Sequence, residues 1–114
     1  MDCIFCKIIN GEIPSSKVYE DDKVLAFNDI NPIAPYHILV VPKEHYNSIL
    51  DIPENKMDIV AHIHNVINII SRDKGFSENG FRIINNCGED GGQMVKHLHY
   101  HILAGKKLPL YEEI

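Results

Sequence analysis

The sequence predicts an α+β fold: a mostly antiparallel sheet with one long helix and a short N-terminal helix, the helices lying on one side of the sheet. Three observations favour this class. Segments with the composition of β-strands lie before and after a single long segment whose apolar residues have helical spacing. The 114 residues are enough for one domain, 1–114, that buries about two-thirds of its unfolded surface. No repeat, linker or low-complexity segment divides the chain.

The beginning of the chain has the pattern of a short helix followed by a hairpin. Residues 3–10 carry apolar side chains at helical spacing, and Gly11 is a typical C-terminal stop. Residues 17–20 and 23–27 are typical of two strands that turn at a pair of aspartates. We therefore expect a helix and then a hairpin before the proline-containing loop at 28–35.

Three further elements follow this loop. The apolar run at 37–41 ends at Pro42, which predicts a strand buried on both faces. Residues 53–74 predict the long helix, which Gly75 would end, and residues 81–86 predict another strand. The apolar stripe of the long helix consists of Met57, Ile59, Val60, Ile63, Val66, Ile67 and Ile70.

Three histidines alternate with apolar residues in H-L-H-Y-H at 97–101. This period of two predicts a strand with all three imidazoles on one face, roughly 7 Å apart at the backbone. Imidazoles at this spacing can share one phosphate-sized ligand, one metal, or one of each. Large metal hydrolases with H-x-H on barrel strands need much longer chains, and residues 94–105 contain no carboxylate ligand. The spacing therefore favours a nucleophilic histidine flanked by phosphate-binding groups.

A glycine-rich loop at 88–92 leads into this histidine segment. Gly91 and Gly92 offer backbone N–H groups, and Gln93 adds an amide donor. By itself a glycine pair is typical of a turn. Its place just before the histidines predicts a cradle that binds a phosphate without a formal positive charge.

The charge and hydropathy of the chain narrow its partners. A net charge of −5 argues against a broad surface for nucleic acid or anionic membrane, although one phosphate needs only local donors. No apolar run approaches the ~20 residues of a membrane span. The start M-D-C lacks the basic residues of a signal peptide. We therefore expect a cytoplasmic protein with no nucleic-acid or membrane partner.

Cys3 and Cys6 form a C-x-x-C motif that would place both sulfurs on one side of a helical turn, as metal binding requires. A thioredoxin-like role would instead need the motif directly after a strand in a βαβ unit. A closed tetrahedral site needs two more ligands. The candidates are His45, His62, His64, His97 and Cys87. His62 and His64 are two apart on the long helix and cannot share a ligand.

Residues 86–105, N-C-G-E-D-G-G-Q-M-V-K-H-L-H-Y-H-I-L-A-G, resemble the signature of the histidine triad (HIT) superfamily. The resemblance continues through C-I-F-C-K-I-I, D-D-K-V-L-A-F-N-D-I-N-P, P-Y-H-I-L-V-V-P-K-E-H and F-R-I-I-N-N. The chain is most similar to the histidine triad nucleotide-binding branch, whose members hydrolyse purine nucleoside phosphoramidates. This resemblance implies a purine nucleotide substrate and a homodimer.

The resemblance also implies a covalent mechanism. His99 would attack the α-phosphorus and form a nucleotidyl-histidine that water then hydrolyses. A neutral imidazole can do this near pH 7. His101 and Gln93 would hydrogen-bond the nonbridging oxygens as charge develops on them. His37 would either orient these groups or relay a proton to the leaving amine.

A nucleoside pocket follows from the same resemblance. Asp29 would accept hydrogen bonds from both ribose hydroxyls. The other expected nucleotide contacts are Phe5, Ile8, Phe27 and Ile30 at the base, Asn86 at the phosphate end, and Gly92, Gln93, Met94, Val95, His99 and His101. The alternative for each apolar residue is core packing. Met94 replaces a serine found in many such hydrolases, so a side-chain hydroxyl is lost while the backbone N–H remains.

The resemblance further implies a structural zinc ion bound by Cys3, Cys6, His45 and His97, which would tie the N-terminus to the sheet. Two other functions stay open: a dinucleoside polyphosphate hydrolase of a neighbouring HIT branch, and a nucleotide-binding regulatory module with incidental catalysis. A nucleotidyltransferase is disfavoured, because those relatives resemble H-P-H-P-Q and this chain has His101 at the third position.

Overall fold

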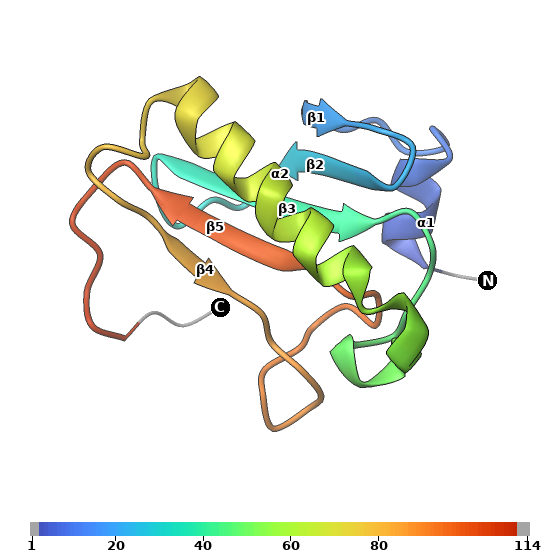
Figure 1. The fold of residues 1–114 in the computed structure, drawn as a ribbon. Helices are drawn as coiled ribbons and strands as arrows, with labels where there is room; N and C mark the ends of the chain where they lie inside the picture. The colour runs from blue at the N-terminus through green and yellow to red at the C-terminus, as the bar shows by residue number, and fades with distance from the viewer. Residues whose placement is uncertain (1–2, 112–114) are drawn as a thin grey trace.

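The computed structural model describes residues 3–111 and contains one five-stranded antiparallel sheet in the order β1-β2-β3-β5-β4 (Figure 1). The elements are α1 (Ile4–Ile9), β1 (Lys17–Glu20), β2 (Val24–Asn28), β3 (Tyr36–Pro42), η1 (Ile49–Asp51), η2 (Glu54–Lys56), α2 (Asp58–Lys74), β4 (Arg82–Ile84) and β5 (Tyr100–Ala104). The predicted α+β class is confirmed. None of the helices between residues 3 and 111 is long and apolar enough to cross a bilayer.

The long helix ends where the sequence predicts but begins later. Gly75 has φ +84°, a left-handed conformation that glycine adopts without steric cost, and it caps α2. The predicted start at Pro53 is wrong, because a 3-10 turn at Glu54–Lys56 precedes the first α-helical residue, Asp58. The strand predicted at 81–86 is also shorter and covers only Arg82–Ile84.

The central strands are buried on both faces, so both faces of the sheet need a cover. On one face α2 packs over the core; this cluster includes Val24, Ala26, Ile38, Val40, Ile102, Ile63, Val66, Ile67 and Ile70. On the other face the α1 segment packs over a second core cluster, which includes Leu25, Phe27, Leu39, Val41, Cys3, Phe5 and Ile8. The expectation that the helices share one side is therefore wrong. Figure 1 shows α2 crossing the front of the sheet and α1 at the right of the view, next to the end of β3.

Strand register decides which face carries the histidines. His101 lies opposite Leu39 in the β3–β5 pairing, and His37 lies two residues before Leu39 on the same strand. Cross-strand partners and residues two apart share a face. His37 and His101 therefore lie on the α1 face, and α2 lies behind them.

Asp21 closes the turn between β1 and β2 and ties it to α2. Its Oδ1 accepts the backbone N–H groups of Lys23 and Val24, both at 2.8 Å. Its Oδ2 accepts hydrogen bonds from Tyr19 Oη at 2.9 Å and from His62 Nε2 at 2.8 Å. Burial acts to raise the pKa of Asp21, but these four hydrogen bonds outweigh it and lower the pKa to about 2.

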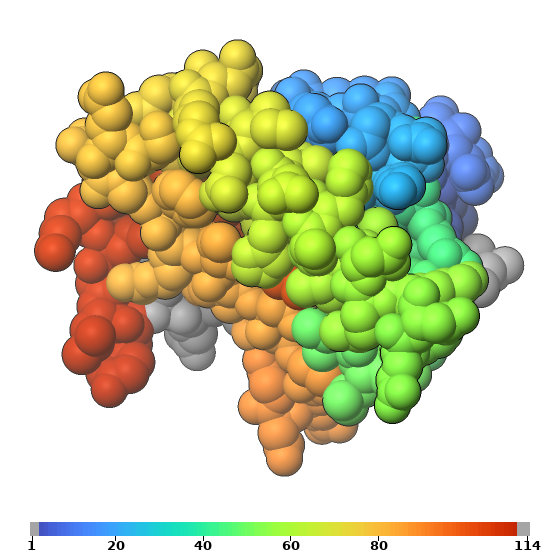
Figure 2. All heavy atoms as spheres, in the orientation of Figure 1, coloured from blue at the N-terminus to red at the C-terminus, as the bar shows by residue number. Residues whose placement is uncertain are grey.

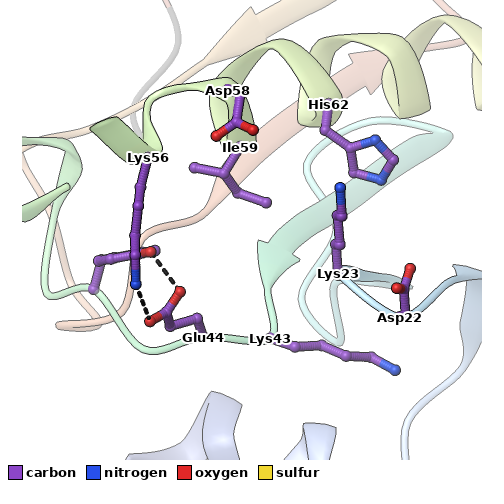
Figure 3. A pocket seen from close by; sticks show the side chains of 9 residues that line it. Asp22, Lys23, Lys43, Glu44, Lys56, Asp58, Ile59 and His62 are labelled. Carbon is purple, nitrogen blue, oxygen red and sulfur yellow. Dashed lines mark hydrogen bonds and ion pairs between the residues drawn. The ribbon is translucent and has the colours of Figure 1, made fainter. Parts of the chain in front are cut away.

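A cavity of about 260 Å³ lies beside this turn, on the α2 side of the molecule (Figure 3). Charges of both signs line it, and several pair within the protein. Lys56 Nζ lies 3.3 Å from Glu44 Oε1, and the Tyr46 hydroxyl donates to Glu44 Oε2 at 2.6 Å. None of the motif histidines at 97–101 lines this cavity.

Replacing Asp21 by asparagine should lower the free energy of unfolding at pH 7 by about 1–2 kcal/mol, because the ionised carboxylate is stabilised in the folded state. The folded pKa lies below the unfolded value, so this contribution is complete above about pH 4 and is lost as the pH falls towards about 2. Urea denaturation of both proteins at pH 7 and near pH 2 measures it. The difference should shrink at low pH, and an equal difference at both values would contradict the assignment. The neighbouring Asp22→Asn is the matched control.

Candidate functional site

Two histidines of the motif lie side by side on the α1 face, with a third from β3. The ring centroids of His99 and His101 are 5.1 Å apart, and those of His37 and His101 are 5.2 Å apart. The His97 ring lies on the same side, since Phe5 of α1 contacts the rings of both His97 and His99, but the prediction that residues 97–101 all lie in one strand is wrong. β5 begins only at Tyr100, because the backbone N–H of Leu98 donates to Tyr46 O at 2.7 Å instead of continuing the pairing. The bend turns the His97 ring towards the cysteines.

A chain of hydrogen bonds assigns the ring protons of His37 and His101. The Ile33 N–H donates to His37 Nδ1 at 3.3 Å, so the proton of His37 is on Nε2. His37 Nε2 lies 2.9 Å from His101 Nδ1 and donates to it. In neutral His101 the proton is then on Nε2. This N–H has no protein acceptor among residues 3–111 and is free to donate to a ligand.

His99 has the opposite arrangement. Its Nδ1–H donates to the backbone carbonyl of His97 at 2.7 Å, which leaves a lone pair on Nε2. Within the described chain, Nε2 makes no hydrogen bond. A free imidazole lone pair therefore lies beside a free imidazole N–H, a pairing that suits attack on phosphorus with a donor for the phosphoryl oxygen.

Burial keeps these rings neutral. The side chains of His37, His99 and His101 are all buried. Desolvation lowers the pKa of His37 and of His99, and desolvation together with the charges of His99 and His37 lowers the pKa of His101 to about 4. At neutral pH the His99 lone pair is therefore not blocked by a proton.

Asn85, which sequence reasoning missed, anchors the backbone of the histidine segment. Asn85 Nδ2 donates to the backbone carbonyl of His99 at 3.0 Å. Asn85 follows β4, the neighbour of β5, so the strand pairing brings it next to His99. Asn85 lies within F-R-I-I-N-N, but nothing in that segment by itself distinguishes it as a site residue.

Three of the four predicted base-pocket residues gather near His99. The Phe5 ring packs edge-on against two rings. Its centroid lies 5.1 Å from that of His99 and 5.6 Å from that of Phe27. Ile8 belongs to the same buried cluster. Ile30, in contrast, is 91% exposed and does not belong to this buried cluster, so its contact with a base stays a prediction.

Asp29 lies at the edge of the histidine group. Its Oδ1 accepts the Asn31 N–H at 2.8 Å, and its Oδ2 lies 3.4 Å from His37 Nε2. The side chain stays 20% exposed, so its oxygens can still accept hydrogen bonds from a ligand. The predicted ribose-binding carboxylate is thus next to the predicted phosphate-binding histidines.

Backbone N–H groups of the glycine-rich loop form hydrogen bonds within the loop itself. The Gly92 N–H donates to Glu89 O and the Gln93 N–H to Gly88 O, both at 3.0 Å. A Cβ on Gly91 would lie 2.3 Å from Cys87 O, so only glycine fits this closed turn. The loop is therefore a self-contained turn, and its role as a phosphate cradle stays a prediction.

Gln93 anchors the loop to a neighbouring segment. Its Nε2 donates to Asn47 O at 2.6 Å and to Val95 O at 2.9 Å, and its Oε1 accepts the Gly88 N–H. Both amide protons are thus bonded within the protein. In Figure 2 the orange segment that includes this loop projects beside the green segment near residue 50.

The remaining predicted nucleotide contacts surround this loop. Asn86 Nδ2 donates to Gly91 O at 2.8 Å, and Val95 packs against the core of the α1 face. Met94 is 87% exposed, and it lines an open cavity of about 610 Å³ together with Cys3 and His45.

The four predicted metal ligands converge. One donor atom of each of Cys3, Cys6, His45 and His97 lies within 4.8 Å of every other. The Nδ1 of His97 is 3.3 Å from Cys3 Sγ, 3.6 Å from Cys6 Sγ and 3.0 Å from His45 Nδ1. Cys6 Sγ is 3.3 Å from His45 Nδ1. Tetrahedral zinc with ordinary bond lengths separates sulfur from nitrogen by roughly 3.5 Å and two nitrogens by roughly 3.3 Å, so the four atoms fit such an ion.

The hydrogen bonds at the Nε2 atoms of His97 and His45 support this fit. His97 Nε2–H donates to Pro42 O at 2.9 Å, and His45 Nε2–H donates to Asn47 Oδ1 at 2.8 Å. Both Nδ1 atoms therefore carry lone pairs that face each other across 3.0 Å. A cation relieves this repulsion, and a carbonyl on the second nitrogen is the usual support of a metal-bound histidine. Asn47, which sequence reasoning missed, thus supports both His45 and Gln93.

Comparison with known proteins agrees with this site. The model of the HIT domain family matches residues 10–108, most of the chain. The chain belongs to the HIT domain family. Its structure is similar to that of a histidine triad protein from Clostridium difficile, with 78% identity and a TM-score of 0.95, over 98% of this chain and 97% of that one.

Other HIT relatives carry more specific descriptions. A HIT family hydrolase from Clostridium thermocellum is 46% identical with a TM-score of 0.92, over 96% of each chain. A histidine triad nucleotide-binding protein from Candida albicans is 34% identical with a TM-score of 0.82, over 99% of this chain and 85% of that one. A 14 kDa zinc-binding protein from Zea mays is 43% identical over 92% of this chain and 83% of its own length.

Proposed function

We propose that this protein is a hydrolase that cleaves the P–N bond of purine nucleoside 5′-phosphoramidates through a nucleotidyl intermediate on His99. The observation that carries the proposal is the pair of free ring nitrogens: a lone pair on His99 Nε2 and an N–H on His101 Nε2. Relatives described as a HIT family hydrolase and as a histidine triad nucleotide-binding protein support the reaction class.

The proposed reaction has two displacements at one phosphorus. First, His99 Nε2 forms a bond to the α-phosphorus while the bond to the leaving nitrogen breaks, and the departing amine takes up a proton. Water then attacks the same phosphorus and releases the nucleoside monophosphate and neutral His99. In both steps the His101 N–H stabilises the charge on a nonbridging oxygen.

The His97 carbonyl holds the tautomer of His99 through each displacement. When phosphorus bonds to Nε2 the ring becomes cationic, and its Nδ1–H strengthens the hydrogen bond to that carbonyl. His37 sets the His101 tautomer and lies 3.4 Å from Asp29, so it would either orient His101 or supply a proton towards the leaving amine.

The neighbouring residues suit a nucleoside. The edge of Phe5 and the ring of Phe27 offer an apolar wall for a purine beside His99. The exposed oxygens of Asp29 would accept hydrogen bonds from the ribose hydroxyls. Substrate would thus extend from α1 to the start of β5.

Replacing His99 by alanine should lower turnover of adenosine 5′-phosphoramidate at least about 1000-fold, because no other lone pair takes its place. Release of adenosine monophosphate measures this, and acid-free quenching with mass spectrometry should detect the nucleotidyl adduct on the wild-type protein. His64→Ala is the matched control, since His64 lies exposed on α2 and packs on Tyr100.

Undiminished turnover by His99→Ala would exclude the mechanism. The same assay with diadenosine polyphosphate tests the substrate class: a higher rate on that compound would favour a dinucleoside polyphosphate hydrolase. Tight binding of the monophosphate with negligible turnover of either substrate would favour a regulatory module.

We also propose that Cys3, Cys6, His45 and His97 hold a structural zinc ion. Support comes from the tetrahedral spacing, from the two facing lone pairs, and from relatives in Zea mays and Brassica juncea described as zinc-binding proteins. Zinc there would cross-link the start of α1 to the bend before β5. The ion would support the backbone around His97 and would not contact the substrate.

Elemental analysis of protein purified without chelators should find about one zinc ion per chain. Cys3→Ser should remove it and lower the thermal midpoint by about 10 °C, because the cross-link between α1 and the sheet is lost. Cys87→Ser, which changes a cysteine outside the cluster, should keep both the zinc and the midpoint. Absence of zinc from the wild-type protein would contradict the assignment.

We further propose a homodimer. β4 is an edge strand of the described sheet, and Ile83 lies opposite Ile102, on the α2 face. Ile83 is 36% exposed beside the unpaired backbone groups of β4, and Ile69 adds exposed apolar surface on α2, at 48%. Light scattering during gel filtration should give the mass of two chains, and Ile83→Glu should shift it to that of one. A monomeric wild-type protein would refute the dimer.

A further inference from the structure

We propose that Cys3 and Cys6 are a reversible oxidation site, at which a peroxide forms a disulfide that dismantles the metal cluster and releases the support of His99. The inference rests on the metal site proposed above. It goes beyond that site because it assigns the two sulfurs a covalent reaction with each other.

The local geometry permits the disulfide. Cys3 is the N-cap of α1 and Cys6 is the third helical residue, and the Cys6 N–H donates to Cys3 Sγ at 3.3 Å. Cα atoms three apart in a helical turn are about 5 Å apart, within the range that a disulfide spans. The two Sγ atoms already lie within 4.8 Å. Rotation of the side chains is therefore sufficient, and α1 need not unfold.

A small oxidant can reach the pair. Cys3 lines the open cavity of about 610 Å³, together with His45, Met94 and Val95. Cys6 is only half-buried, and neither sulfur is in a disulfide in this structure. Cys87, the third cysteine, is outside the cluster.

The reaction balances with hydrogen peroxide as the oxidant. The Cys3 thiolate attacks one peroxide oxygen, the O–O bond breaks, and the products are a Cys3 sulfenic acid and hydroxide, which takes up a proton. The Cys6 sulfur then attacks the Cys3 sulfur and displaces the second oxygen as water. Overall, two thiolates, one peroxide and two protons from the solvent give one disulfide and two waters, and the cation that the thiolates held is released.

The consequence reaches His99 by two routes. The disulfide leaves the cluster with two imidazoles of its four ligands, so His97 is no longer held through Nδ1. The carbonyl of His97 is the acceptor of the His99 Nδ1–H at 2.7 Å. Phe5, between the two cysteines, contacts the rings of both His97 and His99, at 5.9 Å and 5.1 Å. Movement at either cysteine is thereby transmitted to the reactive ring.

The experiment uses zinc-loaded Cys87→Ser protein, in which Cys3 and Cys6 are the only thiols. Hydrogen peroxide should release about one zinc ion per chain, detected with a chromogenic chelator. Trypsin cuts after Lys7, so both cysteines lie in the peptide 1–7, which should become lighter by two hydrogen atoms. Turnover should fall about 10-fold or more while the protein stays folded by circular dichroism. Dithiothreitol with zinc should reverse all three changes.

Zinc retained after peroxide treatment would overturn the proposal, as would oxygen addition to either cysteine without a disulfide. Histidine NMR separates positioning from general damage: the His99 ring signals should shift on oxidation while those of His64, on the other face, stay in place. A chain that takes up no zinc would also overturn it, and elemental analysis before the peroxide step would identify that as a failure of the metal site. Zinc release and the disulfide do not depend on substrate, so they would stand even if the proposed hydrolysis failed.

Discussion

The hydrogen bond from His99 Nδ1 to the backbone carbonyl of His97, 2.7 Å long, connects every part of the site. It fixes the tautomer that leaves a lone pair on His99 Nε2. It also joins His99, the proposed nucleophile, to a residue whose ring lies among two cysteines and His45. A backbone carbonyl suits this task, because its position depends on the fold of the chain and not on a rotamer. The bend at His97 therefore positions the proposed metal ligand and the proposed nucleophile together.

The strands β2 and β3 are buried on both faces of the sheet. α2 packs on one face and leaves the other to α1 and the histidines. Desolvation on that face lowers the pKa of His99 and of His101, so the rings stay neutral. The same burial that stabilises the sheet thus sets the protonation state on which nucleophilic attack depends.

The HIT family membership and the geometry address different parts of the function. The relatives include a hydrolase, a nucleotide-binding protein and zinc-binding proteins by description. The arrangement of lone pairs and donors indicates which nitrogen would attack, His99 Nε2, and which would donate a hydrogen bond, His101 Nε2. The geometry also distinguishes His99 and His101, each with a ring nitrogen that bonds to nothing else in residues 3–111, from Gln93. The Gln93 amide already donates to the backbone carbonyls of Asn47 and Val95.

Local patterns in the sequence predicted the α+β class, the central strands, the end of α2, and the convergence of the C-x-x-C motif with His45 and His97. These depend on periodicity, turn chemistry and motifs, which are encoded in neighbouring residues or in the family resemblance. The two-sided cover of the sheet, the bend at His97, and the support from Asn47 and Asn85 were beyond its reach. Each of these depends on segments far apart in the chain that only packing brings together: the Leu98 N–H bonds to Tyr46 O, and β5 begins only at Tyr100, so His97 lies before the strand that carries His101.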